Sequence, residues 1–147
     1  MTDRATMNPF YQRLKSQLES LGGMFNAHLH LDRAGTLDEQ YMQQHGHVIL
    51  ENSHISLHEK HSLINVLHSG LAYEKDDLSR RINACLDVMV ASNTFRADSL
   101  VDVSADRVGL TAFATMHEIK QARAHEIDLR IGAYSPFGFR DDAPDCV

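Results

Sequence analysis

His28 and His30, separated by one leucine, are the residues of this sequence best suited to chemistry. The segment around them is short and largely apolar, which predicts a β-strand, and side chains on a strand alternate between its two faces. Both imidazoles therefore point the same way. Two imidazoles at the end of a strand can bind one divalent cation, and imidazole suits zinc or iron. The alternative is a pair of half-buried histidines hydrogen-bonded to carbonyl groups.

The elements that must position these histidines alternate along the chain. Apolar periodicity, caps and breakers predict helices within 1–22 and at 56–71, 75–92 and 108–124, and strands at 24–31, 94–103 and 127–134. Thr36 and Glu39 have capping-box spacing and predict a further short helix. Strands that alternate with helices imply parallel pairing through right-handed crossovers, so we expect an α/β fold. Residues 140–147 read as a loose tail.

Composition narrows the class of protein. The chain has 147 residues, enough for one domain or part of one, with 43% hydrophobic and 23% charged residues. The formal charge is −6 and no basic run occurs, so we expect no nucleic-acid partner. No apolar stretch approaches the roughly 20 residues of a membrane helix. Two widely spaced cysteines form no metal-type motif and fit free thiols in a reducing cytoplasm.

Several segments in order resemble a known family. The run Asn-Ala-His-Leu-His-Leu-Asp at 26–32 resembles the first-strand signature of the amidohydrolase superfamily. Further along, Phe-Arg at 95–96, Val-Asp-Val-Ser at 101–104 and Ile-Asp-Leu-Arg-Ile-Gly-Ala-Tyr at 127–134 are similar to its bacterial cytosine deaminase-like branch. Those enzymes run Arg-Thr-His-Val-Asp-Val, a helix, then Ile-Asp-Leu-Gln-Ile-Val-Ala-Phe. The resemblance spans roughly residues 23–139.

The resemblance implies a fold and a site. It implies that 1–147 is a partial metal-dependent hydrolase domain, formed by the first three or so strand–helix units of a (β/α)₈ barrel. It implies that His28 and His30 bind one Zn²⁺ or Fe²⁺, and that Asp32 and Phe137 are candidate substrate-binding residues. Asp32 could orient substrate, hold the loop through backbone N–H groups or cap it. The remaining ligands and the catalytic acid or base are expected beyond Val147, since a barrel needs about 250 residues.

The chain also departs from the family pattern. The run Ser-Pro-Phe-Gly at 135–138 stands where the deaminases have Pro-Gln-Glu-Gly, and Pro136 cannot replace the glutamine that hydrogen-bonds the pyrimidine. Two extra residues precede Val101, so we expect a rebuilt pocket or a bulged strand. Arg96 is expected to make an internal ion pair with an acidic neighbour, and Asp102 is either that neighbour or a cap for the following turn.

A second group of histidines recurs along the helix predicted at 56–71: His54, His58, His61 and His68. Clustered imidazoles titrate near pH 6.5, so one interpretation is a surface metal site or a pH-responsive patch. The other is a solvated helix face opposite the buried leucines, and we expect this arrangement.

Two main functions follow from these residues. The first is the N-terminal portion of an amidohydrolase or deaminase that hydrolyses a C–N bond of a small, heterocyclic substrate with metal-activated water. A partner chain or homo-oligomer would then complete the barrel. The alternative is a non-catalytic remnant of the fold that works by association with another chain. A histidine-rich metal-buffering protein is a third possibility, and it predicts several metals per chain.

Overall fold

The computed structural model describes residues 8–42, 54, 56–136 and 138. Its elements follow the order expected from the sequence. They are the helices α1 (Pro9–Ser20), α2 (Glu39–Met42), α3 (Leu57–Ser69), α4 (Lys75–Ala91) and α5 (Thr111–Ala122), the 3₁₀ turns η2 (Leu31–Arg33) and η4 (Leu71–Tyr73), and the strands β1 (Met24–Leu29), β2 (Thr94–Asp102) and β3 (Asp128–Tyr134).

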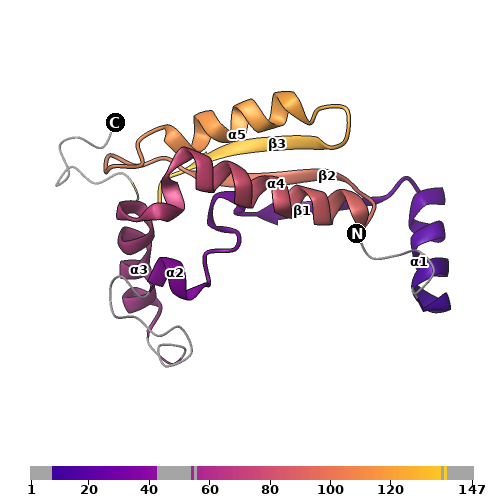
Figure 1. The fold of residues 1–147 in the computed structure, drawn as a ribbon, viewed down its shortest axis with the longest axis horizontal. Coiled ribbons are helices and arrows are strands. Elements are labelled where there is room, and N and C mark those ends of the chain that lie inside the picture. Colours follow the sequence, from indigo (N-terminus) through magenta and orange to yellow (C-terminus); the bar gives the residue numbers. More distant parts are fainter. Residues whose placement is uncertain (1–7, 43–53, 55, 137, 139–147) are drawn as a thin grey trace.

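The strands form one parallel sheet in the order β1-β2-β3. The expected α/β class with interleaved helices is therefore confirmed. Helices α4 and α5 are the two crossover helices, and they run side by side along the sheet (Figure 1). The β2–β3 register is continuous from Arg96↔Asp128 to Asp102↔Tyr134, whereas the β1–β2 register shifts twice. The irregularity is therefore on the β1 side of β2.

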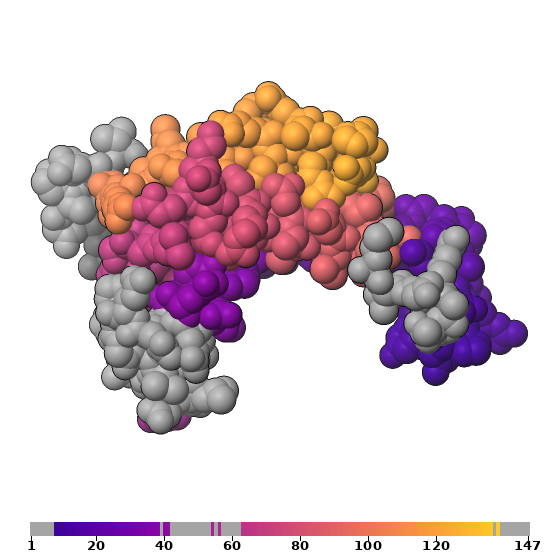
Figure 2. All heavy atoms as spheres, viewed as in Figure 1, coloured from indigo at the N-terminus to yellow at the C-terminus, as the bar shows by residue number. Residues whose placement is uncertain are grey.

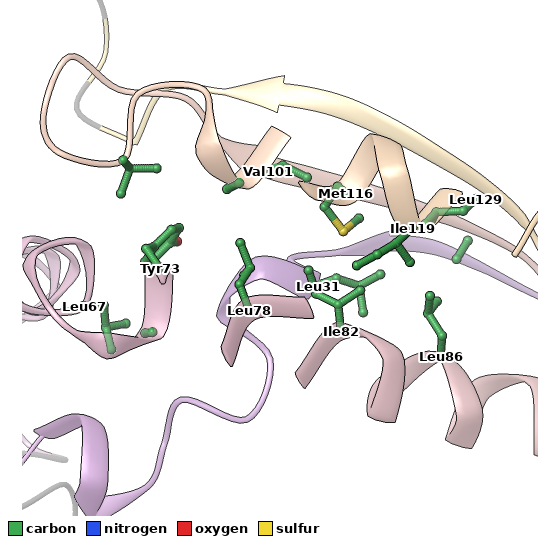
Figure 3. Packing of buried hydrophobic residues seen from close by; sticks show 14 of the residues in the cluster. Leu31, Leu67, Tyr73, Leu78, Ile82, Leu86, Val101, Met116, Ile119 and Leu129 are labelled. Carbon is green, nitrogen blue, oxygen red and sulfur yellow. The ribbon is translucent and has the colours of Figure 1, made fainter. Parts of the chain in front are cut away.

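The core lies between these two helices and one face of the sheet. Alternate residues of β2, Ala97 and Val101, are fully buried toward the helices. The buried side chains of α4, Leu78, Ile82 and Leu86, recur every four residues, which is the spacing of a single helix face. Figure 3 shows this face opposite Leu31, Met116 and Ile119. Burial of this stripe is what fixes α4 against the sheet.

Arg81 anchors the loop that follows β1. Its guanidinium is almost fully buried and donates to the backbone carbonyls of Asp32, at 3.0 Å, and of Ala34 and Ala72. Its Nε also donates to Asp77 at 2.8 Å. One α4 side chain therefore holds both 3₁₀ turns beside the carboxyl end of the sheet.

The start of α2 differs from the capping-box prediction. Asp38 accepts from the backbone N–H of Gln40 at 3.0 Å, so Asp38 caps the helix. The Thr36 hydroxyl instead donates to the carbonyl of Arg33 at 2.7 Å. The Thr36 hydroxyl bonds to the preceding 3₁₀ turn because a carbonyl oxygen of that turn lies within hydrogen-bond distance.

Helix α1 begins as expected and packs differently from the other long helices. Asn8 caps it by accepting from the N–H of Phe10 at 2.9 Å, with Pro9 at the first helical position. No α1 residue is buried, and Figure 2 shows the helix as a lobe to one side of the body. Within the described part of the chain, no helix combines the length and apolar character that crossing a bilayer requires.

Candidate functional site at the carboxyl edge of the sheet

The carboxyl ends of the three strands bring His30, Asp102 and Tyr134 to one edge of the sheet. The rings of His28 and His30 lie in contact, with centroids 5.2 Å apart and planes at 81°. The ring of Tyr134 lies 5.4 Å from that of His30. Strand alternation predicted that the two imidazoles point to one side, and this side-by-side placement is confirmed.

The contact between the two rings is compatible with two ligands of one metal ion. Two nitrogens at the zinc–imidazole distance of about 2.0–2.1 Å lie roughly 3–4 Å apart, a separation that rings 5.2 Å apart allow. His30 Nδ1 is buried and has no hydrogen-bond partner among the described residues. Burial and the nearby charge of Arg33 lower the pKa of His30, which favours the neutral ring that a ligand requires. Over the described ranges, no group of three or more His, Cys, Asp or Glu side chains could hold a metal.

Asp32 lies beneath this edge with a fully buried side chain. Its Oδ2 accepts from the backbone N–H of Asp102 at 2.9 Å and from the hydroxyl of Tyr73 at 3.1 Å. Burial and the charge of Asp102 raise the pKa of Asp32. These contacts tie the loop that carries Asp32 to the end of β2 through one backbone N–H group and to η4 through the Tyr73 hydroxyl. Its Oδ1 is buried without a hydrogen-bond partner among the described residues.

Asp102, at the end of β2, is the centre of a buried network. Arg33 binds it with two nitrogens, Nε to Oδ2 at 2.8 Å and Nη2 to Oδ1. The Tyr73 hydroxyl lies 2.7 Å from Oδ2, and His68 Nε2 lies 3.1 Å from the same oxygen. Burial alone raises the pKa of Asp102, but hydrogen bonds from His68, Arg33 and Tyr73 lower it to about 2. The carboxylate is therefore ionised at neutral pH, and it joins β2 to η2, η4 and α3.

His68 corrects the prediction of a solvated histidine face. Its side chain is 2% exposed, and both ring nitrogens contact carboxylates, Nε2 that of Asp102 and Nδ1 that of Asp106 at 2.5 Å. Burial lowers the pKa of His68, but the hydrogen bonds to Asp102 and Asp106 raise it by more. Helical periodicity could not show this, because the partners lie 34 and 38 residues away in the sequence. His54 is exposed, and the side chains of His58 and His61 lie outside the described part.

The remaining predicted residues have mixed outcomes. Arg96 forms an ion pair with an acidic neighbour as expected, Nε to Oδ2 of Asp128 at 2.7 Å, but this pair is partly exposed and not internal, and it does not involve Asp102. The reason is register, since Arg96 and Asp128 are direct neighbours across β2 and β3. Phe137 and the tail at 140–147 lie outside the described residues.

Sequence reasoning missed Tyr73 and Arg33 as network members. Arg33 follows the histidine motif by three residues, and Asp102 ends an apolar strand, so parallel topology could have paired them at one sheet edge. Tyr73 lies in a 3₁₀ turn between two helices, with no local signal of its partners.

This edge therefore combines an open histidine pair with a buried network of Arg33, Tyr73, His68 and two aspartates. The network fixes the ends of β1 and β2 relative to each other, whereas His30 of the histidine pair has a buried nitrogen without a hydrogen-bond partner in the described part of the chain. Searches against protein-family models and against curated proteins found no match to this chain.

Proposed function

We propose that this chain supplies the two-histidine part of the metal centre of an amidohydrolase-type enzyme, of the cytosine deaminase-like branch. The enzyme would hydrolyse a C–N bond of a small, heterocyclic substrate. The observation that carries the proposal is the ring contact of His28 and His30 at the carboxyl edge of a parallel sheet. That edge is where (β/α)₈ barrels hold their active sites.

The topology supports the barrel part of the proposal. In a (β/α)₈ barrel, consecutive strands are neighbours and their helices form one outer layer. The order β1-β2-β3, with α4 and α5 packed against each other, has that pattern. Doubly wound sheets instead reverse their strand order and place helices on both faces.

In this proposal the two histidines bind the metal, and hydrogen bonds of neighbouring side chains hold the strand that carries them. A Zn²⁺ or Fe²⁺ ion held there would supply a bound water of lowered pKa as the nucleophile. His28 and His30 would ligate through their ring nitrogens, and the Asp32–Tyr73–Asp102 hydrogen bonds fix the end of β1 that carries them. Zinc-type catalytic sites take about three protein ligands. In this proposal, strands beyond this sheet or from a partner chain supply the rest.

Metal content tests the proposal directly. The full chain is dialysed against Zn²⁺ or Fe²⁺, and bound metal is counted by elemental analysis. We expect one metal per chain, and loss of that metal in the double variant His28→Ala/His30→Ala. Because neither histidine is in the core, this variant should remain folded, which circular dichroism checks.

The matched control is His117→Ala/His125→Ala, which removes two exposed histidines from α5 and the loop after it. It should keep the metal of the unaltered chain. Equal metal content in both double variants, or no specific metal in the unaltered chain, contradicts the proposal. Several metals per chain, lost stepwise with any histidine, would indicate the metal-buffering alternative.

A second candidate function is a non-catalytic module that works by association. Within the described residues, β1 and β3 each pair on one side only, and every β1 residue from Met24 to His28 is exposed. Unpaired parallel edges are templates for another chain. Light scattering of the purified chain tests for self-association, and a hydrolase screen with added Zn²⁺ or Fe²⁺ separates the candidates. Turnover by the chain contradicts the purely associative function.

A further inference from the structure

A hollow of about 310 Å³ opens beside His28 on the face of the sheet opposite the core. This volume is at the lower end of the range for small-molecule sites. Its lining comes from all three strands and includes His28, Asp98, Leu100, Arg130 and Gly132. Ala97 belongs to the buried core, so strand alternation turns its neighbour Asp98 to the opposite face of the sheet, where Asp98 lines the hollow.

Three side chains with different chemistry form one row across this hollow. Asp98 and Arg130 are direct register partners on β2 and β3. His28 lies at the same level of β1, between the paired positions Asn26↔Ala97 and Leu29↔Ser99. A hydrogen-bond acceptor, a guanidinium donor and the histidine of the proposed metal site therefore lie side by side.

Within the part of the chain that the structure describes, both charged groups of the row, Asp98 and Arg130, retain unused hydrogen-bonding capacity. Asp98 Oδ1 is buried and has no partner among the described residues. The Nε of Arg130 lies 3.8 Å from the Asp128 carboxylate, too long for a hydrogen bond, and its side chain is 55% exposed. A buried acceptor left unpaired is unfavourable, so an N–H group from a ligand would relieve it.

Gly132 of β3 lines the hollow beside its register partner Leu100 of β2. A Cβ at this position would come within 2.9 Å of Leu100 Cδ2. The Leu100 side chain therefore occupies the space in which a Cβ at position 132 would lie, and the glycine allows Leu100 to pack against β3 at the edge of the hollow.

We propose that this hollow binds a small amide that also carries a carboxylate, its N–H donating to Asp98 and its carboxylate binding Arg130. Guanidinium groups favour carboxylates because two parallel N–H···O bonds match the fork. The adjacent Asp98 charge repels any anion bound to Arg130, and it repels a dianionic phosphate more strongly than a monoanionic carboxylate. This substrate class rests on the proposed function: it keeps hydrolysis of a C–N bond by a water that a metal beside His28 would activate, with an amide in place of the heterocycle.

The hydrolytic step balances with water alone. The water oxygen forms a bond to the amide carbonyl carbon, and the C–N bond breaks. The departing nitrogen takes both protons of the water, so the products are a carboxylate and an ammonium group. No oxidant, reductant or further reactant is needed.

Three matched probes test the binding geometry on the full chain, with chelator present. N-acetylglycine carries both the N–H and the carboxylate, N-acetylglycinamide lacks the carboxylate, and N-acetylsarcosine lacks the N–H. Affinities are measured by chemical-shift titration. We expect millimolar binding of N-acetylglycine, the order of magnitude available to so small a ligand, and at least about tenfold weaker binding of both analogues.

Variants assign each contact. In Arg130→Gln, N-acetylglycine should bind no better than N-acetylglycinamide, because the carboxylate has lost its partner. In Asp98→Ala, N-acetylglycine should bind no better than N-acetylsarcosine. Arg13→Gln, which neutralises an exposed arginine of α1, is the matched control and should leave all three affinities unchanged.

The outcomes separate this inference from the metal proposal, since chelator removes metal from the titration. Equal affinity of the three probes for the unaltered chain, or no binding of any probe, overturns the inference while His28→Ala/His30→Ala still tests the metal. Selective N-acetylglycine binding in a chain that binds no metal supports the hollow and contradicts only the metal proposal.

Discussion

Two histidines at the same end of the sheet have opposite environments. His68 is 2% exposed, and each of its ring nitrogens contacts a carboxylate. His30 is partly exposed, its ring contacts the rings of His28 and Tyr134, and its buried Nδ1 has no hydrogen-bond partner among the described residues. The pKa of His68 is raised and that of His30 is lowered, each away from the ordinary value.

This difference separates a structural histidine from one available for binding. Both ring nitrogens of His68 bind carboxylates, and these bonds join α3 to the end of β2 and to the loop beyond it. The neutral His30 ring keeps a nitrogen lone pair for a ligand. Substitutions at the two positions should therefore affect different measurements, stability at His68 and binding at His30.

The largest expected effect is that of His68→Ala on stability. It removes a cation between two carboxylates, one of them fully buried, so the free energy of unfolding should fall by about 3 kcal/mol. Urea unfolding followed by circular dichroism measures the change. His125→Ala, an exposed histidine after α5, should change it by less than about 0.5 kcal/mol. Similar losses for both variants would contradict a structural role for His68.

The pH dependence of stability should show the contribution of Asp102 on the acid side and that of His68 on the alkaline side. Asp102 has a native pKa of about 2, below its unfolded value, so its contribution is present above about pH 4 and lost as pH falls through 2. That contribution is about 2 kcal/mol. His68 has a raised native pKa, so its contribution is present below the unfolded value near 6.5 and lost as pH rises through the native value.

Stability should therefore be highest between these limits, and urea unfolding at a series of pH values measures the profile. In His68→Gln the loss on the alkaline side should be smaller, because glutamine does not titrate. An unchanged alkaline limb in this variant would assign that loss to another group.

A smaller effect is expected for Tyr73→Phe. The hydroxyl lies within hydrogen-bond distance of both Asp32 and Asp102, so its removal leaves two buried carboxyl groups without this donor. The expected loss is about 1–2 kcal/mol in the free energy of unfolding. Tyr11→Phe on exposed α1 is the control and should be neutral. Equal values for the two phenylalanine variants would contradict the role of Tyr73.

The smallest effect on stability is expected for His28→Ala/His30→Ala. His30 Nδ1 has no hydrogen-bond partner among the described residues and neither ring belongs to the core, so the free energy of unfolding should change by less than about 0.5 kcal/mol in chelator. With Zn²⁺ added, the unaltered chain should gain stability by mass action and the variant should not. A large loss in chelator would place this pair with His68 as a structural element.

Local sequence patterns predicted most of the fold. The caps and the four-residue spacing in α4 gave helix positions within a few residues, and apolar runs gave the three strands. Alternation also predicted that His28 and His30 lie on one side. Each of these properties depends on neighbours a few residues apart. The start of α5 is an exception, because residues 104–109 form a turn closed by a Ser104–Gly109 bridge.

By itself, the sequence determined the α/β class, the strand that carries the histidine pair and the side to which the pair points. Only the tertiary structure decided that His68 is buried, that Arg96 pairs with Asp128, and that Asp32, Tyr73 and Asp102 share one network. The physical reason is that burial and ion pairing depend on segments that register and crossovers bring together. No periodicity within one helix or strand carries that information.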